Sequence, residues 1–173
     1  MKKILTILAI VIAVVLLGAF AVDWPDPSIT VDGMEVQGPD EFRGDIVEGL
    51  DLLREKAPEH YKMVVKNIRK VYLSDDDFNG WILNVGFAFS QEAYDGIIDN
   101  PEYKNYYIAL TLSHEGRHAQ RWNDGEDTHD IPTEEWHAVE TEKEVAKLID
   151  APQGIKDWLE TKYATKWWEE EGL

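Results

Sequence analysis

The chain contains no cysteine among its 173 residues, which excludes disulfide bonds and any metal site built from thiolates. Basic residues are scarce as well, because 17 Lys and Arg face 34 Asp and Glu and the formal net charge is -17. The phosphates of nucleic acids need a basic surface, so we expect no nucleic-acid partner. Any bound metal ion must be held by His, Asp or Glu.

Internal repeats and low-complexity stretches are also absent from the sequence, so a repeat architecture is not expected. Hydrophobic residues make up 44% of the chain and aromatic residues 11%, which is enough for a packed core. The length fits one domain with short appendages.

The N-terminus has the features of an export segment. Lys2 and Lys3 precede an uncharged run, residues 4–22, in which Ala19-Phe20-Ala21 matches a small-x-small cleavage site. The run is also long enough, at about 18 or more residues, to cross a bilayer uncleaved. We therefore expect an extracytoplasmic protein with residues 1–21 as a cleaved signal peptide or an N-terminal membrane anchor.

Residues 22–39 begin as an extended linker, because they contain three prolines. Within them, residues 29–36 resemble a small hairpin, since Asp32-Gly33 suits a tight primed turn. Residues 40–173 then form the main predicted domain.

Helical periodicity dominates this domain, with two short apolar stretches that favour strands. Helices are expected from Asp40, from Pro58, between Pro101 and Trp122, and from about Gly154, and strands at residues 71–73 and 81–90. The sequence therefore predicts an α+β fold that is mostly helical, with a small sheet packed on the long helix.

The long helix carries the sequence His114-Glu115-Gly116-Arg117-His118. Residues four apart lie on one face of a helix, so the two imidazoles can bind a single ion. Imidazole suits zinc, and catalytic zinc sites use three protein ligands plus water. The spacing predicts that His114 and His118 bind Zn²⁺ and that Glu115 reaches a water on the ion. The alternative is a surface helix with two incidental histidines.

A third ligand is expected from the next helix, for which Thr133 is the predicted N-cap. Five glutamates lie between residues 134 and 144, and the first two favour the positive end of the helix. Glu140 is the predicted third ligand, and Glu144 or His137 could replace it. Glu144, one turn after Glu140, could also accept a hydrogen bond from a metal-bound imidazole.

The motif, followed by Glu140 on a second helix, resembles the gluzincin branch of zinc metallopeptidases, and the compact layout resembles the minimal minigluzincins. The resemblance covers about residues 60–150. It implies a zincin-like fold in which residues 40–173 are the catalytic domain, Glu115 is the general base and a downstream Glu completes the zinc site. It also implies that the strand before the active-site helix, Ile82 to Ser90, lines the cleft and pairs with an extended substrate.

The sequence departs from two patterns of related peptidases. Glu144 stands where thermolysin-like enzymes usually have Asp, and the third His of metzincins is missing. The expected function is an exported zinc metallopeptidase that hydrolyses peptide bonds of a peptide or protein substrate through a zinc-bound water activated by Glu115. Candidates for stabilising the oxyanion are His129, His137 and Tyr107.

Two other interpretations stay open. The chain could be a non-catalytic extracytoplasmic binding protein with a structural or vestigial zinc site, whose aromatic tail around Trp167-Trp168 docks a partner. Alternatively, the linker before Pro39 or the tail after Tyr163 could cover the cleft and keep the enzyme latent.

Overall fold

The computed structural model describes residues 26–75, 80–82, 86–126 and 130–164. Within these ranges the chain forms one five-stranded sheet and six helices, so the expected α+β class is confirmed. The predicted export segment, residues 1–21, lies outside the described residues. No helix in the described ranges has both the length and the apolar character needed to span a bilayer.

The elements follow one another along the chain in this order: β1 (Ser28–Val31), β2 (Met34–Gln37), α2 (Asp40–Lys56), α3 (Pro58–Asn67), β3 (Lys70–Ser74), β4 (Gly80–Ile82), β5 (Gly86–Ser90), α4 (Gln91–Ile98), α5 (Lys104–Asn123), α6 (Ile131–Leu148) and α7 (Gln153–Ala164). Four of these helices agree with the sequence pattern, namely α2, α3, α5 and α7.

The predicted hairpin is present, with Val31 opposite Met34 and a turn at Asp32 and Gly33. Both turn residues have positive φ, 45° and 93°, as a primed turn requires. The second strand of the hairpin, β2, pairs in parallel with β3, which pairs in parallel with β5. The hairpin is thus part of the sheet, although the sequence pattern placed it with the linker.

The strand predicted at residues 81–90 is two strands rather than one. β4 turns back onto β5 in antiparallel register, with Trp81 opposite Phe87, and the order in the sheet is β1-β2-β3-β5-β4. Both sides of β5 are therefore hydrogen-bonded. The expectation that the whole stretch Ile82–Ser90 pairs with substrate is wrong for β5, and of the two strands only β4 lies at an edge of the sheet.

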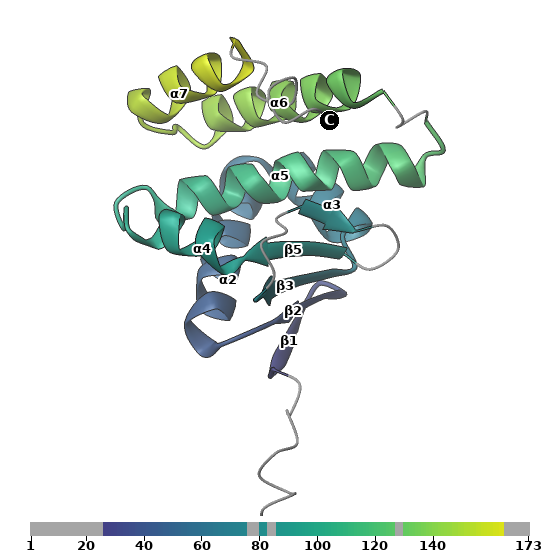
Figure 1. Cartoon of the computed structure of the whole chain (residues 1–173), viewed down its shortest axis with the longest axis vertical. Helices are drawn as coiled ribbons and strands as arrows, with labels where there is room; N and C mark the ends of the chain where they lie inside the picture. Colours follow the sequence, from purple (N-terminus) through teal and green to yellow (C-terminus); the bar gives the residue numbers. More distant parts are fainter. Residues whose placement is uncertain (1–25, 76–79, 83–85, 127–129, 165–173) are drawn as a thin grey trace, which may run out of the picture.

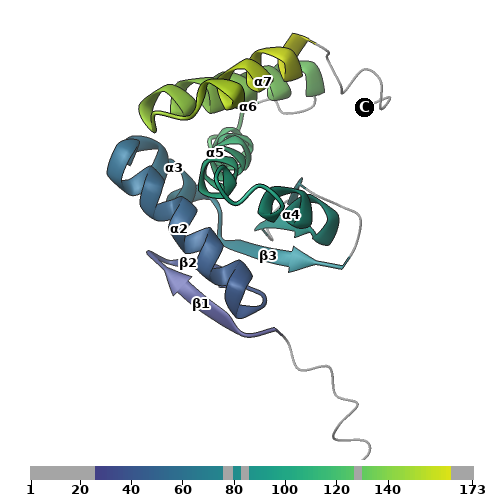
Figure 2. The ribbon, with the colours of Figure 1, turned by 90° about the vertical axis from the view of Figure 1, so that its left-hand side faces the viewer.

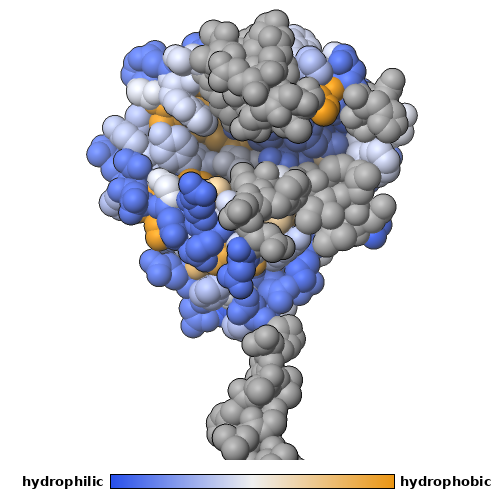
Figure 3. Space-filling view, in the orientation of Figure 1, coloured by the Kyte–Doolittle hydropathy of each residue, from blue (hydrophilic) through white to orange (hydrophobic). Residues whose placement is uncertain are grey.

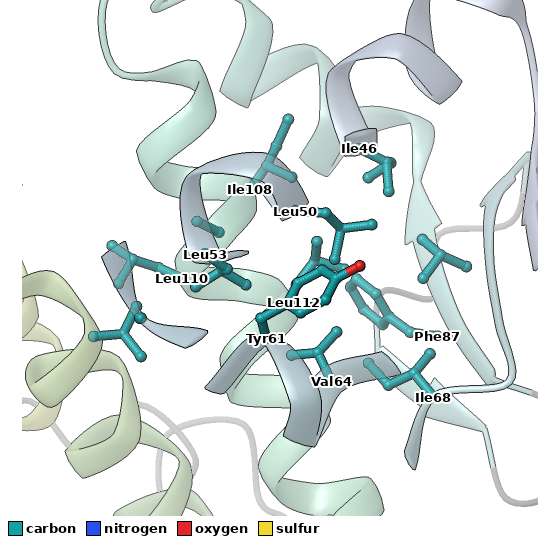
Figure 4. Close-up of a cluster of buried hydrophobic side chains, with 14 of the residues drawn as sticks. Ile46, Leu50, Leu53, Tyr61, Val64, Ile68, Phe87, Ile108, Leu110 and Leu112 are labelled. Carbon is teal, nitrogen blue, oxygen red and sulfur yellow. The ribbon is translucent and has the colours of Figure 1, made fainter. Parts of the chain in front are cut away.

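The main core lies between α2, α3, α5 and the sheet (Figure 4). Its largest contributors are fully buried aliphatic and aromatic side chains, which include Ile46, Leu50, Leu53, Phe87, Ile108 and Leu112. α2 and α5 approach closely because Gly49 has no side chain, and a Cβ there would lie 2.5 Å from Ile108 Cγ2. These contacts fix the long helix α5 on the sheet.

Helices α6 and α7 lie on the side of α5 that faces away from the sheet, as both ribbon views show (Figures 1 and 2). α5 is consequently sandwiched between the sheet and α6. The predicted N-cap Thr133 lies inside α6, which begins at Ile131. The helix starts earlier because Pro132 fits its first turn, where no backbone donor is needed.

Candidate metal centre

The two histidines of the motif lie on the side of α5 that faces α6. Their Nε2 atoms are 3.1 Å apart, and the rings meet at 73° with centroids separated by 4.8 Å. His114 is buried and His118 is partly buried. The four-residue spacing therefore aims both imidazoles at one point, as the motif predicts.

Glu135, in the second turn of α6, is the acidic residue whose carboxylate faces both imidazoles. Its carboxylate oxygens lie 3.4 Å from His114 Nε2 and 3.3 Å from His118 Nε2. We call these three groups the donor triangle, and they are the one set of His and acidic side chains in the described residues whose spacing could hold a metal ion.

The donor triangle can be compared with a tetrahedral zinc site. Four donors placed tetrahedrally around an ion at about 2.0–2.1 Å are separated from one another by about 3.3–3.4 Å. In the structure the two imidazole nitrogens are 3.1 Å apart, and they lie 3.4 and 3.3 Å from different oxygens of Glu135. One ligand atom from each of the three residues lies within 4.8 Å of the others. Two imidazoles and one carboxylate also match the ligand types of catalytic zinc, and they leave one position for water.

The charge state of Glu135 fits the same role. Burial alone would raise its pKa, but hydrogen bonds and positive charge from His114 and His118 outweigh this effect and hold the pKa well below its ordinary value. Its Oε2 is buried and lies 3.4 Å from His114 Nε2. A buried, ionised oxygen that faces an imidazole nitrogen is a favourable ligand for a cation.

The outer nitrogen of each imidazole faces a second buried carboxylate of α6. His114 Nδ1 lies 3.5 Å from Glu142 Oε2, and His118 Nδ1 lies 3.6 Å from Glu134 Oε2. Carboxylates in this position fix the orientation and tautomer of metal-binding histidines and make the ring more basic. The centre thus has three potential ligands and two supporting carboxylates.

Glu134 is in turn held by Arg121 from the last turn of α5. Arg121 Nε donates to Glu134 Oε1 at 2.8 Å, and its Nη1 contacts the carboxylate of Glu126. Both Arg121 and Glu134 are buried. Sequence reasoning assigned no role to Arg121 and gave Glu134 only a favourable position at the positive end of the helix.

The predicted third ligand, Glu140, does not reach the donor triangle. Its side chain is 46% exposed and forms an ion pair with Lys143 at 3.3 Å, whereas the side chain of Glu135 is 12% exposed. Glu144 instead lies 3.7 Å from His60. Among the described residues, Glu135 rather than Glu140 is therefore the candidate third ligand, and Glu142 rather than Glu144 faces the outer nitrogen of His114.

The rejected candidates line a separate groove of about 550 Å³ between α3, α5 and α6. His137 lies there as well, beside the exposed ring of Trp136. Burial and the charges of Arg121 and Arg117 lower its pKa, which favours the neutral imidazole. None of these side chains belongs to the donor triangle.

The proposed general base, Glu115, is buried in α5 next to His114.

Of the candidates for stabilising an oxyanion, His129 lies outside the described residues. Tyr107 packs its ring edge-on against Trp158, with the ring centroids 5.8 Å apart. On the face seen in Figure 3, hydrophilic residues gather between α6 and the sheet-bearing half of the molecule.

Comparison with known proteins adds no assignment to this geometry. No family model, curated protein or solved structure matches the chain.

Proposed function

We propose that the protein is an exported zinc metallopeptidase that hydrolyses peptide bonds. The observation that carries the proposal is the donor triangle of His114, His118 and Glu135, in which one ligand atom from each residue lies within 4.8 Å of the others and the ligand types match those of catalytic zinc. The motif around Glu115 and the resemblance to gluzincins support the same activity.

In this proposal each residue near the centre has one task. The donor triangle holds the ion, while Glu142 and Glu134 orient the imidazoles from behind. When bound, zinc supplies a water of lowered pKa and polarises the substrate carbonyl.

Glu115 moves the proton. Its carboxylate accepts a proton from the attacking water as the oxygen bonds to the carbonyl carbon, and then delivers that proton to the amine nitrogen as the C–N bond breaks. The products are a carboxylic acid and an amine, so the atoms balance without a further reactant. Glu115 is suited to this task because it is buried on the same helix, directly beside a ligand.

The sheet offers a way to hold an extended substrate. β4 is the last strand in the sheet, contacts α5, and pairs on one side with β5, while no described strand pairs with its other side. A peptide that adds to this edge would form main-chain hydrogen bonds largely independent of its sequence.

The proposal that the protein is exported depends on the sequence pattern of residues 1–21.

The experiment compares the purified protein with Glu115→Gln and Glu140→Gln. We expect the unaltered protein and Glu140→Gln to bind about one zinc per chain and to cleave an unfolded protein such as casein. Glu115→Gln should retain zinc and the folded state but lose hydrolysis. Equal cleavage by the Glu115 variant, with inhibition by chelators unchanged, would reject the mechanism.

Burial of the centre between two helices favours one competing function, a zinc ion that is purely structural. In that case no unfolded substrate would be cleaved, and a chelator would unfold the protein. A peptidase should instead lose activity on chelation and regain it when zinc returns.

A further inference from the structure

We propose that Arg121 is a positioning residue that acts through Glu134 to hold the imidazole of His118 in its metal-binding orientation. The inference rests on the proposed metal centre, since it assigns a task to residues behind one of the ligands. It adds a basic residue to a site that otherwise consists of histidines and carboxylates.

Arg121, Glu134 and His118 form a chain of successive side-chain contacts. Arg121 Nε donates to Glu134 Oε1 at 2.8 Å, and the other oxygen, Oε2, lies 3.6 Å from His118 Nδ1. The distance from Glu134 Oε2 to His118 Nδ1 exceeds the length of a typical hydrogen bond by about 0.6 Å, so a small rotation of either side chain would bring the two atoms within hydrogen-bonding distance. One carboxylate therefore contacts the arginine with one oxygen and faces the imidazole with the other.

The oxygen that faces His118 has no competing partner in the described part of the chain. Glu134 Oε2 is buried, and no described residue donates a hydrogen bond to it. A buried carboxylate oxygen without a donor carries a large desolvation cost, which a hydrogen bond from the imidazole N–H would offset. A proton on Nδ1 leaves Nε2 with the lone pair that a metal requires.

Arg121 also links the two helices that supply the candidate ligands, α5 and α6. Its Nε contacts Glu134 in the first turn of α6, and its Nη1 contacts Glu126 just after the end of α5. The carboxylate it holds adjoins the ligand Glu135 in sequence. A single buried guanidinium thus sets the position of the α6 turn that carries both carboxylates.

The chemistry of the pair requires arginine rather than any cation. The planar guanidinium carries its donors at fixed angles, so two carboxylates can be held at once in defined directions. A lysine ammonium keeps the charge but not this geometry. Arg121→Lys is therefore the conservative variant that separates charge from positioning.

The experiment measures zinc affinity by competition with a chromophoric chelator, for the full-length protein and for Arg121→Met, Arg121→Lys and Glu134→Gln. Lys104→Met is the matched control, because Lys104 forms a partly buried ion pair with Asp45 at the opposite end of α5 from Arg121. The visible spectrum of the Co²⁺-substituted protein and the melting temperature of the metal-free protein are recorded for every variant.

We expect zinc affinity to fall about ten- to a hundredfold in Arg121→Met and Glu134→Gln, with a smaller loss in Arg121→Lys. The double variant Arg121→Met/Glu134→Gln should lose no more than the larger single effect, because both changes remove the same contact to His118. The Co²⁺ spectrum should change in these variants and stay unaltered in Lys104→Met.

Two results would overturn the inference while leaving the proposed function intact. In one, the variants bind zinc as tightly as the unaltered protein. In the other, each variant loses zinc affinity in the same proportion to its loss of melting temperature as Lys104→Met does. Such a correlation would indicate that Arg121 has a structural role alone. Should Arg121→Met fail to fold, the nearly isosteric Glu134→Gln decides between these results. Absence of zinc binding by the unaltered protein would instead reject the metal centre itself.

Discussion

His114 and Glu142 lie on neighbouring helices with Nδ1 of the imidazole 3.5 Å from Oε2 of the carboxylate. The side chain of Glu142 is only 3% exposed, so its charge acts on the ring with little screening. We predict that Glu142→Gln lowers zinc affinity about ten- to a hundredfold, because the amide keeps the shape but loses the charge that makes the imidazole basic.

The control for this variant is Glu144→Gln, whose carboxylate is mostly exposed and lies near His60 instead. Calorimetric titration with zinc should give the unaltered affinity for the control. Equal affinities in the two variants would show that Glu142 does not support the centre.

A second prediction distinguishes the revised ligand from the one expected from the sequence. Glu135→Gln removes an anionic ligand and should weaken zinc binding beyond the roughly ten- to hundredfold effect of a supporting carboxylate. Glu140→Gln, five residues along the same helix, should leave the affinity unchanged, because Glu140 pairs with Lys143. The reverse order of affinities, measured by chelator competition, would restore Glu140 as the ligand.

The third prediction concerns alkaline stability. The buried carboxylate of Asp45 accepts hydrogen bonds from Tyr94 Oη at 2.7 Å and from Lys104 Nζ. Burial, followed by the hydrogen bond to Asp45, raises the pKa of Tyr94 above its ordinary value of 10.0. The hydrogen bond to Asp45 likewise raises the pKa of Lys104 above 10.5.

Both groups hold their protons more tightly in the folded state than in the unfolded state. Their contribution to stability is therefore complete below pH 10.0 and falls as the pH rises through the ordinary values toward the folded ones. Melting temperatures measured between about pH 9 and pH 12 should decrease more steeply for the unaltered protein than for Tyr94→Phe. Parallel curves would mean that this phenol contributes nothing to the alkaline transition.

The fourth prediction uses two glycines of α2. A Cβ at position 49 would lie 2.5 Å from Ile108 Cγ2, whereas a Cβ at position 44 would meet nothing within 4 Å. Gly49→Ala should lower the free energy of unfolding, because an overpacking cost of about 1–3 kcal/mol exceeds the gain in helix propensity. Gly44→Ala should instead raise it by up to about 1 kcal/mol.

Urea denaturation of the two alanine variants tests the close approach of α2 and α5. If Gly49→Ala were as stable as Gly44→Ala, the contact with Ile108 would be looser than the structure indicates.

Much of the fold could be read from local patterns. Asp32-Gly33 predicted the hairpin turn, Pro58 the start of α3, and the four-residue spacing of His114 and His118 their common direction. These features depend on backbone chemistry within a few residues. The short helix α4 was missed because eight residues give too few turns for periodicity, although Ser90 caps it by accepting from the N–H of Ala93.

The third ligand could not be found by periodicity, which shows which residues share a helix face but not which face meets the neighbouring helix. The signal was the short connection between the helices. In a helical hairpin, residues about equally distant from the loop lie opposite one another, and this rule pairs His118 with Glu135 and Arg121 with Glu134. Glu140 lies on another side of α6, where it lines the groove.

The face that α6 turns toward α5 carries three buried or nearly buried carboxylates, Glu134, Glu135 and Glu142. Arg121 pairs with Glu134, and the imidazoles of His114 and His118 face all three carboxylates in a setting where water screens charge little. A divalent cation bound by the two imidazoles of α5 and by Glu135 of α6 would link the two helices directly. We therefore expect a zinc ion at this centre, if the proposed function holds, also to keep α6 and α7 packed against α5, so that removing the ion would loosen these two helices.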